Sequence, residues 1–275
     1  MSAEEELARA RRAIEEADAL LVTAGAGMGV DSGLPDFRGD AGFWKAYPPF
    51  AKLGLSFVDL ANPRWFADDP ALAWGFYGHR LNLYRATKPH RGFARLRALA
   101  DEKSHGAFVF TSNVDGHFQR AGFSEQRVVE CHGAIETSQC ATPCDGHLFA
   151  TTREIAVDGA TFRAHGALPT CPRCGELARP NILMFGDGDF IETRTDAQQA
   201  RMNAWLAEVR SAGARLVVLE LGAGLAVPTV RLTSESVARR LGGTLIRVNP
   251  REAETPGGGI SIAAGALEAI ESLLR

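Results

Sequence analysis

Val22-Thr-Ala-Gly-Ala-Gly-Met-Gly-Val-Asp-Ser-Gly-Leu-Pro-Asp-Phe-Arg-Gly39 is the stretch on which the fold of this 275-residue chain depends. A short apolar run over residues 19–23 leads into it and predicts a buried strand, and glycines at positions 25, 27 and 29 follow at once. Because glycine lacks a side chain, its backbone turns tightly and brings N–H groups close to a pyrophosphate. Glycines also mark ordinary turns, so these residues alone fit a dinucleotide site and a structural turn equally well.

The second half of the stretch is a charged loop. Ser32-Gly-Leu-Pro-Asp-Phe-Arg-Gly39 departs from the usual dinucleotide fingerprint, which continues directly into a long helix. It places Asp36 and Arg38 beside the predicted phosphate site, in a loop able to close over a ligand.

Composition narrows the class of protein. With 45% hydrophobic residues the chain can bury a substantial core. A net charge of -3 and a pI of about 6.2 give no overall attraction to nucleic acid or to an anionic membrane, so we expect neither partner. The charged residues 1–18 predict an amphipathic helix and argue against a secretory signal, and no apolar run is long enough to span a bilayer. Five cysteines, four of them in two close pairs, favour a reduced compartment, and we expect a cytoplasmic protein.

The order of predicted elements indicates an α/β fold. Short apolar runs predict strands that alternate with helices, and the strands are expected at residues 19–23, 107–111, 127–130, 179–187, 216–221 and 245–249. Repeated strand, turn and helix with short links predict a doubly wound parallel sheet. Residues 1–40, 87–133 and 179–275 carry this pattern, whereas 41–86 and 134–178 are interpreted as two insertions that form a smaller domain.

Polar residues follow two of the predicted strands. Ser112, Asn113 and Asp115 come after the strand at 107–111, where α/β folds bind ligands. His132 stands between a strand end and Gly133, which makes it a better candidate for a general base than the other six histidines. The alternative for His132 is an ordinary surface or core histidine.

Four cysteines predict a structural zinc site. Cys140 and Cys144 form one close pair, and Cys171 and Cys174 form the other, across a polar, turn-rich insertion. Four thiolates close all four positions of a tetrahedral zinc ion. The alternative is four ordinary reduced cysteines, and Cys131 is left over as a buried thiol.

Several motifs in one order resemble the sirtuin family of NAD-dependent protein lysine deacylases. They are Gly25 to Gly39, Thr111-Ser-Asn-Val-Asp115, His132-Gly133, the four cysteines, Arg179-Pro through Phe185-Gly-Asp187, Gly222-Ala-Gly-Leu225 and Val248-Asn249. The resemblance covers nearly the whole chain. It implies a Rossmann-like large domain, a small domain made of a helical module and a zinc ribbon, and a cleft between them for NAD and an acylated lysine.

The resemblance also implies roles for individual residues. The pyrophosphate of NAD would be held by backbone groups of Ala24, Gly25, Ala26, Gly27, Met28, Gly222, Ala223, Gly224 and Leu225. Asn249 would bind the adenosine ribose, and the nicotinamide end would meet Asp36, Phe37, Arg38, Ser112, Asn113 and Asp115. His132 would deprotonate a ribose hydroxyl as the catalytic base, assisted by Asn113 and Asp115, to give nicotinamide, free amine and O-acyl-ADP-ribose.

The chain departs from the family pattern at four places. Gly29, Ser112 and Ala223-Gly224 stand where the family usually has Ser or Thr, Gln, and a hydroxyl pair. After Phe185-Gly the family carries Glu-x-Leu-Pro, a segment that pairs with the substrate peptide as a strand, and here Leu-Pro is absent. We therefore expect an acylated protein or a small acylated amine as the substrate.

The acyl group is predicted from one helix. Tyr77 and Arg80 are three residues apart and share a helix face, which resembles the Tyr-x-x-Arg pair of sirtuins that remove succinyl and related acidic groups. With Phe185 they are the expected acyl-binding residues. The alternative is an arginine that pairs within the helical lobe beside a tyrosine that packs in it.

Two other functions remain open on sequence grounds. One is an enzyme that stops after nicotinamide loss, as an NAD glycohydrolase or ADP-ribosyltransferase. The other is a non-catalytic sensor of NAD or ADP-ribose. A histidine at position 132 favours catalysis, because a sensor needs no base there.

Overall fold

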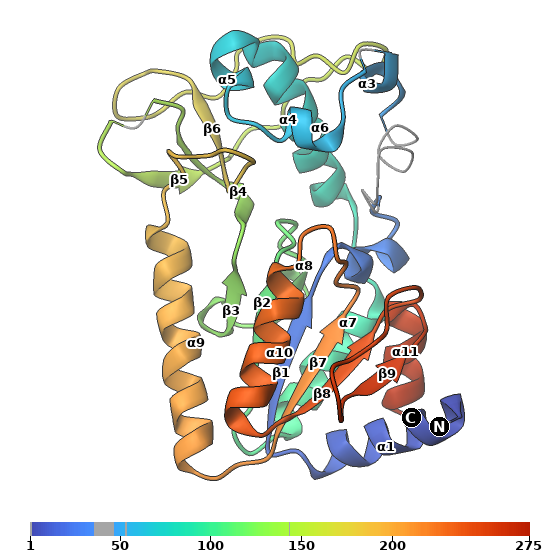
Figure 1. The fold of residues 1–275 in the computed structure, drawn as a ribbon. Coiled ribbons are helices and arrows are strands. Elements are labelled where there is room, and N and C mark those ends of the chain that lie inside the picture. The colour runs from blue at the N-terminus through green and yellow to red at the C-terminus, as the bar shows by residue number, and fades with distance from the viewer. Residues whose placement is uncertain (1, 36–46, 53, 143) are drawn as a thin grey trace.

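The computed structural model describes residues 2–35, 47–52, 54–142 and 144–275 as two lobes, one above the other in Figure 1. The lower, larger lobe contains a six-stranded sheet with helices on both sides. The upper, smaller lobe contains short helices and a three-stranded sheet.

The large sheet has the strand order β3-β2-β1-β7-β8-β9, and every neighbouring pair in it is parallel. Its strands are β1 (Ala19–Ala24), β2 (Ala107–Thr111), β3 (Val128–Glu130), β7 (Leu216–Leu221), β8 (Thr244–Val248) and β9 (Ile260–Ile262). The chain runs outward from β1 to β3, and then returns to build the other half outward from β7. In doubly wound sheets, ligands bind beyond the carboxyl ends of the strands where the order reverses, which here lies between β1 and β7.

Apolar burial on both faces holds this sheet. Leu20 and Val22 pack with α1 (Ala3–Glu16), α7 (Arg91–Glu102) and α11 (Ala266–Leu273) on one face. Leu21, which points the opposite way, packs with α9 (Thr193–Ser211) and α10 (Thr229–Leu241) on the other (Figure 1). The connections add η1 (Ala26–Ser32), α8 (His117–Arg120) and η2 (Glu125–Arg127).

The small lobe is built from two separate parts of the chain. Its elements are α3 (Pro48–Lys52), α4 (Phe57–Leu60), α5 (Trp65–Asp68), α6 (Pro70–Ala86), β4 (Gly133–Cys140), β5 (Leu148–Ala150) and β6 (Ala178–Ile182). The strands form an antiparallel sheet in the order β5-β4-β6. Trp74 of α6 packs in an aromatic core, and its indole N–H donates to the carbonyl of Ala178 at 2.9 Å, which joins the helical part to the sheet.

The predicted fold class is confirmed. The strands β4, β5 and β9 were not predicted, and β6 was expected without its partner. Because β6 pairs with β4, the smaller sheet continues past residue 178, where we placed the boundary of the insertion. Among the residues that the structure describes, no helix is long and apolar enough to cross a bilayer.

Candidate functional site

Loops at the carboxyl edge of the large sheet are joined by hydrogen bonds. The N–H of Ser112 donates to the carbonyl of Ala24 at 3.1 Å, and the side-chain amide of Asn113 donates to the carbonyl of Gly25 at 3.0 Å. The N–H of Gly25 in turn donates to the carbonyl of Leu221 at 3.0 Å. The predicted cofactor residues after β1, β2 and β7 therefore lie together.

The two glycine turns are packed backbone against backbone. The N–H of Gly27 donates to the carbonyl of Gly222 at 3.0 Å, and Gly222 has a φ of 63°. A Cβ on Gly222 would lie 2.5 Å from the Cα of Gly27, so a larger residue is excluded there. Beside these turns is a cavity of about 110 Å³, lined by Gly27, Gly222, Val248, Pro250 and Ala264 among others. It has the size for part of a dinucleotide and lies where the strand order reverses.

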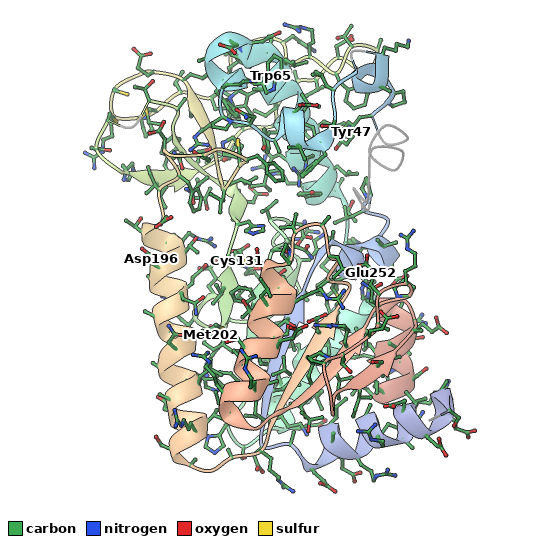
Figure 2. The ribbon with its side chains drawn as sticks, viewed as in Figure 1. Tyr47, Trp65, Cys131, Asp196, Met202 and Glu252 are labelled. Atoms are coloured by element: carbon green, nitrogen blue, oxygen red, sulfur yellow. The ribbon has the colours of Figure 1, made fainter. Side chains whose placement is uncertain are left out.

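The side chain of Asn249 forms hydrogen bonds within the protein. Its side chain is buried, its amide donates to the carbonyl of Ala223 at 2.8 Å, and its Oδ1 accepts from the N–H groups of Arg251 and Glu252, both at 3.0 Å. A carboxylate oxygen of Glu252 then accepts from the N–H of Leu225 at 3.1 Å. Asn249, expected as a ribose ligand, thus fixes the loop after β8 against the second glycine turn. Glu252 and Cys131 are labelled in Figure 2, at the end of the large lobe that faces the small lobe.

Asp115 carries a strongly perturbed carboxyl group. Its residue is 8% exposed, and burial raises its pKa from 3.8 to about 6. The N–H of His117 and the positive charges of Arg120 and Arg80 act in the opposite direction. A Cβ on Gly29 would lie 3.8 Å from this carboxylate, so the hydroxyl that the family has at this position would stand near Asp115.

His132 lies at the junction between the large sheet and the small sheet. It follows β3 directly and precedes Gly133, the first residue of β4, whose φ of 79° suits glycine alone. The carbonyl of His132 accepts from the N–H of Leu183 at 3.0 Å. Burial lowers the pKa of His132 below its usual 6.5, so its imidazole is neutral and able to accept a proton at neutral pH.

The predicted acyl-binding residues surround one buried guanidinium. The guanidinium of Arg80 donates to the hydroxyl of Tyr84 at 2.8 and 3.0 Å, and it lies 5.8 Å from the ring centres of both Tyr77 and Phe57. Phe57 also makes an edge contact with Phe185, at 6.3 Å between ring centres. Tyr77, Arg80 and Phe185 therefore border one group of aromatic rings, which includes Phe57 and Tyr84 and which we call the aromatic cluster.

The loop after β6 is closed by a buried ion pair. Both guanidinium nitrogens of Arg179 donate to Asp187, at 2.7 and 2.8 Å, and these two side chains are at most 1% exposed. Asp187 also accepts from the N–H groups of Met184 and Asp189. This turn occupies the place where the family's peptide-pairing segment was expected.

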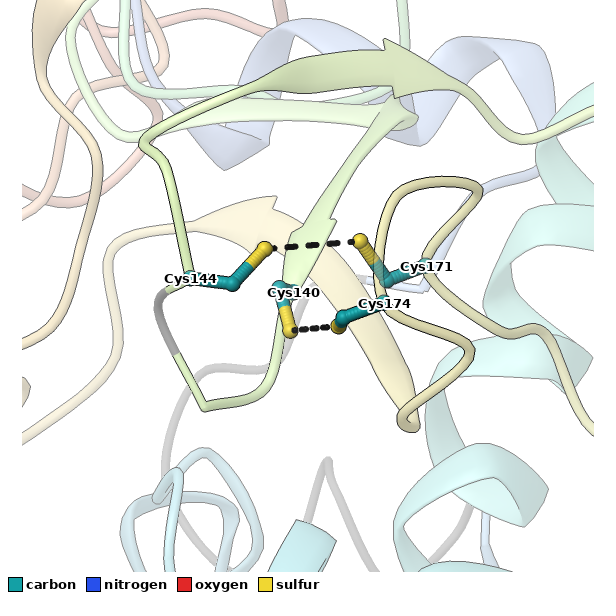
Figure 3. Close-up of side chains that lie close together, drawn as sticks. All are labelled: Cys140, Cys144, Cys171 and Cys174. Atoms are coloured by element: carbon teal, nitrogen blue, oxygen red, sulfur yellow. Dashed lines mark hydrogen bonds between the residues drawn. The ribbon is translucent and has the colours of Figure 1, made fainter.

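Four sulfurs form a compact cluster in the small lobe (Figure 3). The sulfurs of Cys140 and Cys174 are 3.7 Å apart, those of Cys144 and Cys171 are 3.8 Å apart, and all four lie within 4.8 Å of one another. Sulfurs held about 2.3 Å from one zinc ion form a tetrahedron with edges of about 3.8 Å. The residues therefore fit a closed, structural zinc site.

Sequence reasoning located most of these groups and missed others. Asp36, Phe37 and Arg38 lie outside the described residues. Tyr84 was missed, although its spacing of four from Arg80 on a helix signals contact. No local pattern signalled Glu252 or the pairing of Arg179 with Asp187.

Comparisons with known proteins identify similarity to the Sir2 family. A family model described as the Sir2 family matches residues 25–208. The chain is 31% identical over 274 residues to the NAD-dependent protein deacylase of Deinococcus radiodurans, covering 98% of this chain and 99% of the relative. It is 33% identical over 253 residues to the NAD-dependent protein deacylase of Aeropyrum pernix, covering 91% and 89%. The crystal structure of a Sir2 homolog–NAD complex is similar with a TM-score of 0.71 and 26% identity, over 98% of this chain and 92% of that one.

Proposed function

Because this chain belongs to the Sir2 family, we propose that it is an NAD-dependent protein lysine deacylase that prefers acyl groups carrying a carboxylate. Its relatives are named for NAD-dependent deacylation, and the preference for an acidic acyl group is the finer part of the proposal.

The residues present fit NAD. The backbones of Ala24 to Met28 and of Gly222 to Gly224 would hold its pyrophosphate, since Gly27 and Gly222 line the cavity beside the two turns. Asn113 and Asp115 would meet its nicotinamide end. When bound, NAD supplies a glycosidic bond to nicotinamide that is broken and a ribose that accepts the acyl group.

His132 is the proposed general base. Because burial keeps its imidazole neutral, it is able to take a proton from a ribose hydroxyl at neutral pH. Its backbone carbonyl accepts from the N–H of Leu183, the residue after β6, and its chain continues into β4, so its backbone is fixed at the junction of the two lobes.

The observation that supports the acyl preference is that the guanidinium of Arg80 lies 5.8 Å from the ring centre of Tyr77. The hydroxyl of Tyr77 is buried and makes no hydrogen bond within the described part of the chain. A carboxylate placed between Tyr77 and Arg80 would accept from both. Hydrogen bonds to charged groups contribute about 1.5–3 kcal/mol, enough to favour succinyl over acetyl by about tenfold or more.

Electrostatic effects link the proposed acyl-binding residues to Asp115, which is expected at the nicotinamide end. The positive charge of Arg80 acts on the pKa of Asp115, and the charge of Asp115 acts on that of Tyr84. A guanidinium, a phenol and a carboxyl group from α6 and the loop after β2 thus share one electrostatic environment. This is the arrangement needed if an acyl group is to reach the bond that breaks.

The direct test is product analysis by mass spectrometry. We expect NAD with succinyl- or malonyl-lysine peptides to react at least about tenfold faster than NAD with acetyl-lysine peptides, and Arg80→Met to reverse the order. Arg64→Met, which alters an exposed arginine of the same lobe, should leave the order unchanged. Equal or greater activity on acetyl-lysine in the unmodified protein would end the acyl proposal.

The catalytic role of His132 is tested separately. His132→Ala should lower acyl transfer by about a hundredfold or more while NAD still binds. Unchanged turnover would reject His132 as the base. The same product analysis separates the rivals, because a glycohydrolase forms ADP-ribose without releasing the amine and a sensor forms no product.

A further inference from the structure

A second cavity, of about 430 Å³, opens beside the connection from α6 to α7. Its lining contains four cationic side chains, a histidine, and three apolar residues, Pro89, Ala94 and Ala121, and we call this cavity the basic pocket. The cationic residues are Arg85, Lys88, Arg91 and Arg120, and the histidine is His90. The basic pocket shares no lining residue with the cavity at the glycine turns.

The basic pocket is unusual for a chain with more acidic than basic residues. The protein has a net charge of -3, yet none of the acidic residues that the structure describes lines this cavity. Arg85 pairs with Glu136 and Arg91 pairs with Glu271, both outside the lining. Lys88 is exposed and forms no ion pair or hydrogen bond with the described residues.

The helix ends around the basic pocket also favour an anion. The last carbonyls of α6 would repel one, but the guanidinium of Arg120 donates to the carbonyls of Tyr84 and Thr87 and covers them. At the other side, Arg91 is the first residue of α7, so the positive end of that helix dipole faces the cavity.

We propose that the basic pocket binds a small phosphorylated anion. Arginine and lysine suit the doubly charged phosphate group, and the cavity has the volume of a metabolite site rather than of a single ion. The three apolar residues in the lining suit a carbon skeleton attached to the phosphate. A nucleic acid, as a macromolecular polyanion, is the alternative that the test must separate.

His90 connects the basic pocket to the dinucleotide turn. The N–H of Gly92 donates to its Nδ1 at 3.1 Å, so the ring proton is on Nε2, which donates to the carbonyl of Met28 at 2.9 Å. The N–H of His90 also donates to the hydroxyl of Ser32 at 3.0 Å. A ligand in the basic pocket would therefore lie one side chain away from η1.

The test is calorimetric titration of the zinc-loaded protein, saturated with ADP-ribose so that the proposed dinucleotide site is filled. Inorganic pyrophosphate and ribose 5-phosphate are the two probes, and they distinguish a free from an organic phosphate. We expect one of them to bind with one-to-one stoichiometry, and Lys88→Gln/Arg91→Gln to weaken binding at least about tenfold. Arg239→Gln/Arg240→Gln removes two exposed charges from α10, on the opposite face of the sheet, and should leave binding unchanged.

Each outcome of these titrations either supports or overturns the proposal. An unchanged thermal midpoint in both double variants shows that a loss of binding is local. Because ADP-ribose is itself a phosphorylated anion, the titration is repeated without it. No binding of either probe to the unmodified protein in both titrations overturns the proposal, and so does an equal loss in the α10 variant. A single-stranded oligonucleotide that binds more tightly than both probes, and loses its binding in Lys88→Gln/Arg91→Gln, overturns it in favour of a nucleic-acid surface. The readouts are binding constants and thermal midpoints, so they stand apart from the outcome of the deacylase assays.

Discussion

The two sheets of this protein are stabilised in different ways. Every strand of the large sheet from β1 to β8 is almost fully buried, and its apolar residues contact helices on both faces. In the small sheet, β5 is only half-buried and β4 carries Glu136, Thr137, Ser138 and Gln139, while four cysteines meet at one end. The large sheet depends on many small apolar contributions, whereas the small sheet packs on an apolar core through β6 and part of β4 and depends in addition on one crosslink.

This difference predicts how each region fails. Loss of one apolar side chain should weaken the large sheet by a fraction of its stability, because the remaining contacts persist. Loss of one cysteine should remove the metal, and with it most of what orders the small sheet.

The largest effect is expected from Cys144→Ser or from removal of zinc by a chelator. Structural zinc contributes about 10–16 kcal/mol of binding free energy in small zinc domains, so the β4–β6 region should lose its order. Hydrogen exchange read by mass spectrometry should show fast exchange in residues 133–182 and continued protection in β1, β2 and β7. Cys131→Ser is the control, since Cys131 lies outside the cluster, and it should keep about one equivalent of zinc. Simultaneous loss of protection in both sheets would contradict the comparison.

A smaller effect is expected from Leu219→Ala in the centre of β7. Leu219 is 1% exposed and packs in the large core, so truncation should lower the free energy of unfolding by about 2–5 kcal/mol. Denaturant unfolding followed by circular dichroism measures it. Leu232→Ala on α10 is the matched control, because Leu232 is 60% exposed and should change stability by about 0.5 kcal/mol or less. Similar losses in both variants would show that burial does not set the stability of this lobe.

Asp115→Asn tests the raised carboxyl pKa of Asp115, which lies in the loop after β2. The carboxyl pKa is raised to about 6 in the folded protein, so the fold favours the protonated form and loses stability as the pH rises from about 4 to about 6. Asparagine removes that loss and still accepts from the N–H of His117. The variant should therefore be more stable by about 1–3 kcal/mol at pH 7.5 and no more stable at pH 4. Thermal unfolding at the two pH values decides it, and an equal gain at both would refute the raised pKa.

The smallest effect is expected from Tyr77→Phe. The hydroxyl of Tyr77 is buried without a hydrogen-bond partner in the described residues, so its removal should be neutral or stabilise the protein by about 1 kcal/mol at most. Tyr84→Phe is the matched variant: it deletes a hydroxyl that accepts from Arg80 and should destabilise the small lobe by about 1–3 kcal/mol. Thermal midpoints without substrate compare the two. If Tyr77→Phe destabilises as much as Tyr84→Phe, the Tyr77 hydroxyl has a structural partner and the acyl proposal loses its support.

The different stabilisation of the two sheets also explains which strands the sequence predicted. Nearly continuous apolar runs such as Leu216–Leu221, which only Glu220 interrupts, predict buried parallel strands, and these were found in the large sheet. The strand β4 was not predicted because Glu136 to Gln139 has no apolar alternation, and its partners are brought to it from far along the chain. β9 was missed because three residues show no periodicity.

The candidate functional site was likewise predicted only in part from the sequence. Strand ends predicted that Asn113, Asp115 and His132 would lie at the carboxyl edge of the sheet, because parallel strands end on the same side. The sequence could not show that the Asn249 side chain would be used by Ala223, Arg251 and Glu252, since those contacts depend on the conformation of two loops. It also could not show that Arg179 and Asp187 would close the turn after β6.

The strand order has a consequence for synthesis on the ribosome. β1 is among the first elements to be made, yet its register with β7 joins Ala24 to Leu221, far later in the chain. At about 5–20 residues per second, the open edge of β1 waits roughly 10–40 s for that partner. During this time β2 can cover only one side, and the apolar residues of β1 remain available to other nascent chains. Slowing translation before residue 216 should therefore lower the soluble yield of this protein more than slowing it after residue 250.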